Sequence, residues 1–299
     1  MFVPCTVITT MSQFTIVMAI KCNTHLHGSQ FNNLERFKQI GLRSYKKFLH
    51  LKDVKEFIVI VPNNEYTGVK AELTEMEPTF PWVFVQESKL LSNGLDAGWQ
   101  RQQTSKLAVS SMVKTPFYLI VDDDTFLTRP FGYEHLFGID DKRLILNMSE
   151  IDFPMWLLWS CKAGGIDVDL VQQENEIMAI TPEIFVTDVV RDLVGTLEKK
   201  YGGSDKMTWQ VALGDNKFTE YTLYWSYLIS IQKAHTLYDT KGKIKVYGYP
   251  VTGPEHMEHI ETRMARAFDT QEPHYFSFIQ SSLNIPLSQL SGLLNKYLC

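Results

Sequence analysis

Three consecutive carboxylates, Asp122, Asp123 and Asp124, directly follow the apolar run 117–121. Such a run is typical of a buried strand, and like charges at its end repel one another unless a cation or several donors offset them. Because strand side chains alternate, Asp122 and Asp124 are predicted to project to one side and Asp123 to the other. Hard carboxylate oxygens suit Mg²⁺ or Mn²⁺, which keep positions open for phosphate oxygens. The triplet therefore predicts a metal-bound diphosphate, although acidic turns that bind nothing share this pattern.

A second group of polar residues lies in the segment that precedes the triplet. Arg101 and Lys106 are candidate contacts to a phosphate or a nucleobase, and Gln102 and Gln103 could donate or accept hydrogen bonds there. The alternative is an exposed helix face, which this composition would suit equally well. We keep both interpretations for this segment.

The elements that must position these residues alternate between strands and helices. Strands are predicted at 14–20, 57–61, 82–85 and 117–121, and a polar turn at 23–32. Helices are predicted at 34–49 and 99–113, and Asn33 is the expected N-cap of the first helix. This β-α-β order predicts an α/β fold with a mostly parallel, Rossmann-like sheet flanked by helices. Ligands bind at the carboxyl ends of the strands in such sheets, which is where the triplet lies.

Beyond Pro130 the pattern is less regular. We expect short strands at 144–147 and 177–180 and helices at 183–201 and 218–234. Because no linker, repeat or low-complexity tract interrupts the chain, one continuous domain is predicted over 1–299. Within it, residues 14–130 would bind the nucleotide and residues 131–299 would shape the acceptor side.

Composition limits the class of protein. The chain has 299 residues, 44% of them hydrophobic, and a net charge of −5, so it can bury a large core and has no dense basic stripe for nucleic acid. Its four cysteines show no zinc or disulfide spacing, which fits a reducing compartment. No apolar stretch is long enough for a membrane span or a signal peptide. We therefore expect a soluble, cytoplasmic protein, in the host cytoplasm if the chain is viral.

Three motifs together resemble the GT-A nucleotide-sugar glycosyltransferases, in particular a branch of bacteria and large algal viruses. The motifs are 98–103 through Lys106, 118–125, and Phe-Thr-Glu-Tyr at 218–221, within a resemblance that extends over about 14–285. It implies a GT-A fold, a UDP-sugar donor, a saccharide or glycoprotein glycan acceptor, and Mn²⁺ or Mg²⁺ across the two phosphates. The viral members suggest xylose as the transferred sugar.

The resemblance also implies individual roles for residues of the donor site. Asp122 would contact the ribose or a nearby basic residue and share the metal site with Asp124, and Lys21 follows the first strand where such folds hold the uridine. These enzymes often add a late histidine to the metal, for which we favour His274, with His256 and His259 as rivals. Gln280 or Ser281 could then touch phosphate oxygens.

An inverting transferase needs a carboxylate to accept the proton of the acceptor hydroxyl during direct displacement. Glu220 is the preferred candidate. The alternative is that this carboxylate, at the start of a helix, only caps the helix. Asp167 and Asp152 are the alternatives, because both lie in the irregular segment. A retaining enzyme would not need this base.

Two other classes of function compete with a glycosyltransferase. A nucleotidyltransferase would also use paired carboxylates and a metal, but it should carry a Gly-rich basic loop near its N-terminus, and residues 21–25 are not one. An inactive nucleotide-sugar-binding protein would need neither metal nor base. The aromatic run 153–159 fits a surface on which sugars stack or a buried helical stripe.

Overall fold

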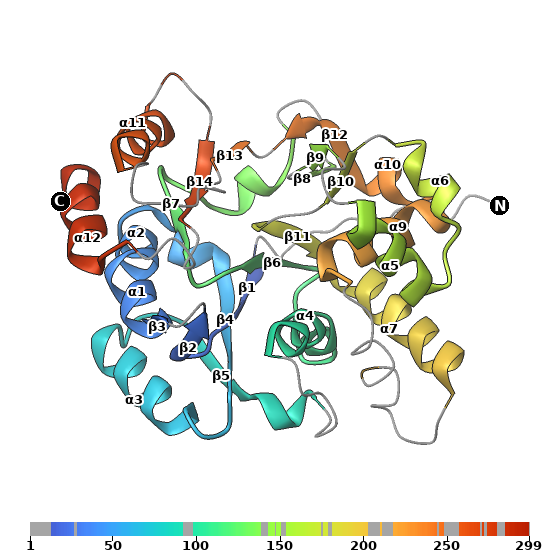
Figure 1. Cartoon of the computed structure of the whole chain (residues 1–299), viewed down its shortest axis with the longest axis horizontal. Coiled ribbons are helices and arrows are strands. Elements are labelled where there is room, and N and C mark those ends of the chain that lie inside the picture. Colours follow the sequence, from blue (N-terminus) through green and yellow to red (C-terminus); the bar gives the residue numbers. More distant parts are fainter. Residues whose placement is uncertain are drawn as a thin grey trace.

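The computed structural model describes residues 13–26, 29–91, 98–138, 143–146, 148–150, 154–174, 176–178, 181–202, 210, 218–243, 245–247, 257–269, 271, 274–279 and 285–298. Its centre is a five-stranded sheet in the order β11-β6-β1-β4-β5 (Figure 1). The strands are β1 (Phe14–Ala19), β4 (Val54–Val61), β5 (Trp82–Gln86), β6 (Phe117–Val121) and β11 (Glu183–Val186). Four strands are mutually parallel, and β11 pairs antiparallel with β6. The predicted α/β fold with a mostly parallel sheet is confirmed.

Helices cover both faces of this sheet. In Figure 1, α1, α2 and α3 lie on one side and α4, α7 and α9 on the other. The helices are α1 (Asn33–Gln39), α2 (Gly41–Phe48), α3 (Tyr66–Met76), α4 (Gly98–Ala108), α5 (Pro154–Gly164), α6 (Val168–Gln172), α7 (Thr187–Tyr201), α9 (Glu220–Ser230), α10 (Ala234–Leu237), α11 (Met257–Ala267) and α12 (Leu287–Leu298). Because β1, β4 and β6 are covered on both faces, their sequences are nearly continuous apolar runs rather than alternating ones.

Short strands and 3₁₀ turns complete the structure. A three-stranded sheet has the order β13-β14-β7, and three strand pairs lie outside it. These strands are β2 (Asn23–Leu26), β3 (Ser29–Asn32), β7 (Thr125–Leu127), β8 (Leu144–Leu146), β9 (Met148–Glu150), β10 (Glu176–Met178), β12 (Tyr238–Lys243), β13 (Lys245–Tyr247) and β14 (His274–Phe278), and the 3₁₀ turns are η1 (Leu51–Asp53), η2 (Glu87–Lys89), η3 (Val109–Ser111) and η4 (Tyr133–Leu136). No helix of the described ranges is long and apolar enough to cross a bilayer.

The predicted helix over 34–49 is interrupted. Ile40, with φ −116° and ψ −73°, ends α1 and precedes α2, and Gly41 begins α2 close to β7. A Cβ at Gly41 would lie 2.8 Å from the Phe37 ring and 3.0 Å from the Thr125 carbonyl oxygen. The chain therefore needs a residue without a side chain where α2 approaches β7. The N-cap is Asn32, whose side chain accepts the Glu35 N–H at 3.0 Å, and not Asn33 as predicted.

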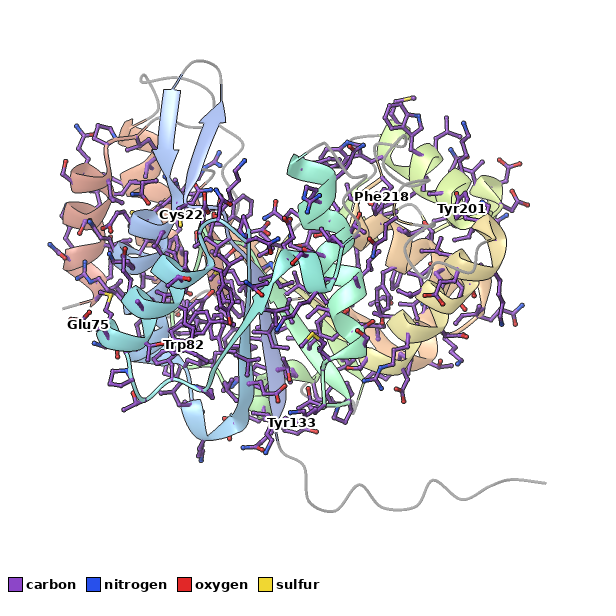
Figure 2. All side chains as sticks on the ribbon, turned by 90° about the horizontal axis from the view of Figure 1, so that it is seen from below. Cys22, Glu75, Trp82, Tyr133, Tyr201 and Phe218 are labelled. Atoms are coloured by element: carbon purple, nitrogen blue, oxygen red, sulfur yellow. The ribbon has the colours of Figure 1, made fainter. Side chains whose placement is uncertain are left out.

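Two other predictions from the sequence are wrong in detail. The polar segment 23–32 forms the β2–β3 hairpin instead of a turn, and it stands out from the body above Cys22 in Figure 2. Residues 183–186, predicted as the start of a helix, form β11, and the helix begins only at Thr187. The pairing of β11 with β6 supplies the backbone partners that favour a strand there.

Candidate active site

The carboxylate triplet lies at the point where the strand order reverses. The chain passes from β1 to β4 and β5 on one side and then returns to β6 on the other side of β1. In open α/β sheets the crevice for a ligand forms outside the carboxyl ends of the two strands at this switch point. Asp122 directly follows β6, so the fold places the triplet at the carboxyl edge next to the end of β1.

Backbone hydrogen bonds hold the triplet in a tight connection between β6 and β7. The Thr125 N–H donates to the Asp122 carbonyl at 3.1 Å, and the Asp122 N–H donates to Thr181 Oγ1 at 3.1 Å. The Ile279 N–H donates to the Asp124 carbonyl at 3.2 Å, at the end of β14. Two segments distant in sequence, at Thr181 and Ile279, thus help to fix this backbone, while the carboxyl groups take no part in these bonds.

The three side chains differ in exposure. Asp122 and Asp124 are partly exposed, whereas Asp123 is buried. Burial, together with the adjacent Asp124 and Asp122 carboxylates, raises the pKa of Asp123 well above its usual range. Asp122 and Asp124 are therefore the members of the triplet that a bound cation could reach from solvent.

Lys106 connects Asp122 to the start of α9. Its Nζ lies 2.6 Å from Asp122 Oδ1, 2.8 Å from Glu220 Oε1 and 3.3 Å from the Tyr221 hydroxyl. Burial alone would lower the pKa of Lys106, but Asp122 and Glu220 outweigh it and raise that pKa, so the ammonium stays charged. Burial raises the pKa of Glu220, and Lys106 opposes that rise.

A second buried cation, Arg36 of α1, lies on the other side of the triplet. Its guanidinium donates to the Ile279 carbonyl oxygen and is attracted electrostatically by Asp124 and Asp123. Around the triplet, the described side chains thus include four carboxyl groups, counting Glu220, and two cations, Arg36 and Lys106. If all were ionised the cluster would carry two negative charges, which one divalent cation would neutralise; without a cation, the raised pKa of Asp123 favours its protonation and leaves one. The donor set of hard oxygens at Asp122 and Asp124 fits Mg²⁺ or Mn²⁺.

The polar residues of α4 lie partly beside Lys106 and Glu220 and partly at the edge of the sheet. Gln103 is buried, and its Oε1 accepts the Glu220 N–H at 3.4 Å. Gln102 is partly exposed and donates to the Ala19 carbonyl at the end of β1, at 3.4 Å. Arg101 forms a 2.8 Å ion pair with Glu87. Lys21, directly after β1, is exposed.

The predicted base Glu220 has no exposed surface and is bonded to Lys106. It cannot contact an acceptor hydroxyl in this conformation, because burial that stabilises the Lys106 pair also excludes the acceptor. Its position instead suits the orientation of Lys106 and, through it, Asp122. Asp167 is exposed and caps α6 by accepting the Asp169 N–H at 3.1 Å. Asp152 lies outside the described residues.

The late histidine is the least well placed of the predicted ligands. The register pairs Phe278 with Thr125, and Ile279 bonds to Asp124, so His274 lies at the opposite end of β14. Five residues of strand separate its backbone from Ile279, about 16 Å at a rise of roughly 3.3 Å per residue. This distance disfavours His274 as a ligand to a cation at Asp124. Gln280, Ser281 and His256 lie outside the described residues, and His259 is described only as part of the α11 backbone.

Sequence reasoning missed Arg36, Thr181 and Ile279, which surround the triplet. Each is separated from it by 55 residues or more in sequence, and no local pattern marks them. A surface pocket lined by Glu56, Lys114 and Arg191, among others, lies at the amino ends of β4 and β6 and shares no residue with this site.

Comparison with known proteins gives a family but no activity. Residues 11–299 match the model of DUF6492, described as a family of unknown function. The chain belongs to this family. No curated protein matches the DUF6492 chain.

Among solved structures, the DUF6492 chain is similar to the galactosyltransferase LgtC in complex with donor and acceptor sugar analogues, with 10% identity and a TM-score of 0.49 over 95% of this chain and 96% of that one. It is also similar to mouse xyloside xylosyltransferase 1, with 8% identity and a TM-score of 0.46 over 92% of this chain and 99% of that one. The bifunctional glycosyltransferase WbbM matches with 8% identity and a TM-score of 0.46, over 89% of this chain and 45% of that one.

Replacing Asp123 by asparagine is expected to stabilise the metal-free protein near neutral pH, because an amide does not ionise in this buried position beside two other carboxylates. The folded-state pKa of Asp123 lies above its unfolded value, so its contribution to stability is complete below about pH 4 and is lost as pH rises through the folded pKa. The urea midpoints of wild type and Asp123→Asn, measured with a chelator across this pH range, should therefore differ more as the pH approaches neutrality. An equal difference between variant and wild type at every pH would contradict this origin.

Proposed function

We propose that this chain transfers a sugar from a UDP-sugar to a saccharide hydroxyl, with a divalent cation held by Asp122 and Asp124. The observation that carries the proposal is the excess of carboxyl groups over cations at the switch point of a parallel sheet. Two of these carboxylates are partly exposed and positioned by a fixed backbone. The three sequence motifs lie in this same region, since α4, the end of β6 and the start of α9 meet at Lys106.

The bound cation would stabilise the negative charge that develops on the nucleoside diphosphate as the glycosidic bond breaks. Asp124 and Asp122 would hold it, and Lys106 would keep Asp122 oriented through their 2.6 Å contact. Lys21 and the partly exposed Gln102 lie at the end of β1, where the uridine is expected. The other side of the cluster, near α5 and α9, would face the acceptor.

Aromatic and apolar side chains gather at the amino ends of α4 and α5. The rings of Trp99 and Trp156 lie 6.4 Å apart at an interplanar angle of 30°, and Trp99 is 43% exposed. Trp99 lies one helical turn before Gln102, which bonds to the end of β1, so this ring lies toward the carboxyl edge of the sheet. Met155 and Leu158 of α5 are also exposed. We assign this surface to the acceptor, because flat apolar rings suit the face of a pyranose.

The donor sugar and the stereochemistry are finer parts of the proposal. Xylose is suggested by resemblance only, and hexose and pentose donors differ by one hydroxymethyl group, which a single side chain can accommodate or exclude. Direct displacement with inversion requires a base other than the buried Glu220 in this conformation. A nucleotidyltransferase is less well supported, because β1 leads into the β2–β3 hairpin and no Gly-rich basic loop follows it.

Calorimetric titration with UDP tests the class of enzyme. UDP is expected to bind in the presence of Mn²⁺ and to bind at least about tenfold more weakly with a chelator, a difference of about 1.4 kcal/mol. A UDP-release assay should then compare UDP-glucose, UDP-galactose and UDP-xylose, and the fastest release identifies the donor. Release of pyrophosphate from a nucleoside triphosphate and a sugar phosphate would support the nucleotidyltransferase instead. Failure of UDP to bind under any of these conditions would exclude the proposed function.

A further inference from the structure

Four ionisable side chains gather at the end of the sheet opposite to the triplet. His50 and Asp53 lie on either side of the start of η1, just before β4, and Glu134 and His135 lie in η4, after β7. His50 Nδ1 is 3.5 Å from Glu134 Oε1 and 3.8 Å from Asp53 Oδ2. One ligand atom from each of His50, Asp53 and Glu134 lies within 4.8 Å of the other two. These residues come from two segments about 80 positions apart in sequence.

This group is distinct from the proposed donor site. Val121, at the end of β6, is in register with Met18 and therefore with Val59 of β4, six residues beyond Asp53. At a strand rise of roughly 3.3 Å per residue, the two sites are about 20 Å apart. In Figure 2, Tyr133 of η4 lies at the lower edge of the body, and Cys22, after the end of β1, lies in its upper half.

Gly132 leaves the space between the three ligand atoms open. A Cβ at this position would lie 2.5 Å from His50 Nδ1 and 3.0 Å from Glu134 Oε2, and closer still to Asp53 Oδ2. The Gly132 backbone is extended, with φ −148°, so its geometry does not require glycine. What requires a residue without a side chain is the convergence of the three ligand atoms on this point.

Neighbouring groups orient the ligands. The Tyr133 N–H donates to Asp53 Oδ2 at 3.1 Å, which fixes a carboxylate that is only 11% exposed. The Gly132 N–H donates to His135 Nδ1 at 3.0 Å, and the His135 ring stacks on Phe131 and thereby forms a wall of the group. Of these two bonds, the one to Asp53 reaches a ligand, and hydrogen bonds to the ligands are characteristic of metal sites.

We propose that His50, Asp53 and Glu134 form a binding site for Zn²⁺ that clamps η1 to η4. Zn²⁺ accepts His nitrogen and Asp or Glu oxygen as ligands, and a site with three protein ligands keeps a water molecule in the fourth position. Ligand atoms about 2.0–2.1 Å from Zn²⁺ in a tetrahedron are about 3.3–3.4 Å apart, so separations of 3.5 and 3.8 Å need only a small contraction. Glu134, whose side chain is 61% exposed, can shorten its separation from His50, and His50, whose side chain is 36% exposed, can shorten its separation from Asp53.

The clamp would reinforce a connection that the backbone already makes. The His50 N–H donates to the Phe131 carbonyl at 2.9 Å, and the Phe131 N–H donates to the Phe48 carbonyl at 2.8 Å. A cation across His50, Asp53 and Glu134 would tie the same two segments through their side chains. Because it binds the folded chain, Zn²⁺ should raise the melting temperature, and the rise should grow with the logarithm of the ratio of its concentration to its dissociation constant.

The test is calorimetric titration of the untagged, full-length chain with Zn²⁺ alone, in an Asp124→Asn background that removes the proposed donor metal site. One Zn²⁺ should bind and raise the melting temperature. His50→Ala, and separately Glu134→Gln, should weaken this binding by about 100-fold or more and remove the thermal shift. Changing a residue that only hydrogen-bonds to a metal ligand already costs about 10- to 100-fold, so losing a ligand should cost at least as much. Glu134→Gln changes an exposed side chain, so it reports on binding even if His50→Ala unfolds the chain.

His235→Ala is the matched control, because His235 is also an exposed histidine paired with a carboxylate, Glu174, at 3.0 Å. It should leave Zn²⁺ binding unchanged. The proposal is overturned if Zn²⁺ does not bind, if it binds equally well to His50→Ala and Glu134→Gln, or if His235→Ala weakens binding to the same degree. Mn²⁺-dependent UDP binding by the otherwise wild-type chain should survive Glu134→Gln, which separates this proposal from that of the donor site.

Discussion

Replacing Asp124 by alanine is expected to abolish metal-dependent UDP binding and to lower the rate of sugar transfer by at least about 100-fold, the scale on which one electrostatic group of an active site acts. The Asp124 side chain is partly exposed, and its carboxylate would hold the cation directly. Its backbone carbonyl accepts the Ile279 N–H whatever the side chain, so the connection between β6, β7 and β14 should survive the change. Asp123 still attracts the buried Arg36 guanidinium, so the loss should appear mainly in binding and turnover and much less in folding.

Titration with UDP in the presence and absence of Mn²⁺, followed by UDP release from the preferred UDP-sugar, measures this loss. Asp124→Asn should behave like Asp124→Ala, because an amide keeps the shape but loses the charge. Asp188→Ala is a matched control, since Asp188 is an 89% exposed aspartate that pairs only with Arg191 of its own helix among the ion pairs described. Mn²⁺-dependent UDP binding by Asp124→Ala at wild-type strength would remove Asp124 from the metal site.

The first half of the fold could be predicted because its signals are local. The apolar runs that form β1, β4 and β6 are strand-sized and end in polar residues, and the segments between them have helical composition. A parallel sheet then places the end of β6 at an edge where ligands bind, so the location of the triplet followed from the order of elements. Such reasoning needs no contact between distant residues.

Where pairing between distant segments decides the structure, sequence reasoning failed. Residues 183–186 continue into a helical pattern, and only their pairing with β6 makes them a strand. His274 is in a segment that does reach the triplet, but the register of β14 on β7 brings Ile279 there instead. The group of His50, Asp53 and Glu134 has no sequence signature, because its members come from two separated segments without the usual ligand spacing.

Lys106 illustrates a different limit. Its place in a polar segment of helical composition fits an exposed phosphate contact, yet the structure buries it almost completely at 1% exposure. A lysine carries a long apolar stem, so a pattern of polar and apolar residues cannot tell whether its ammonium reaches water or a buried carboxylate. Whether Lys106 is buried depends on Glu220, 114 residues away, whose side chain is also fully buried.

Replacing Lys106 by methionine is expected to destabilise the chain by about 3–5 kcal/mol, the usual cost of leaving one member of a buried ion pair without its partner. Methionine is similar in length to lysine, so the loss would come from the charge and not from a cavity. Adding Glu220→Gln should recover much of the stability, because it removes the stranded carboxylate. The matched control is Lys114→Met, in which a 74% exposed ammonium is lost from a 3.1 Å pair with Glu56, and its effect should be within about 0.5 kcal/mol.

The pH dependence of the same variants identifies the group responsible. Burial raises the folded-state pKa of Glu220, and Lys106 opposes this rise, so losing Lys106 raises that pKa further. A carboxyl group with a raised folded pKa contributes stability that is present at low pH and is lost as pH rises through that pKa. The deficit of Lys106→Met should therefore shrink toward about pH 4 and grow toward neutral pH, whereas the Lys106→Met/Glu220→Gln pair should show little of this dependence. Urea unfolding at several pH values, with unchanged slopes, measures both effects. A deficit independent of pH would mean that packing around the Lys106 stem, and not its charge, holds α4 to α9.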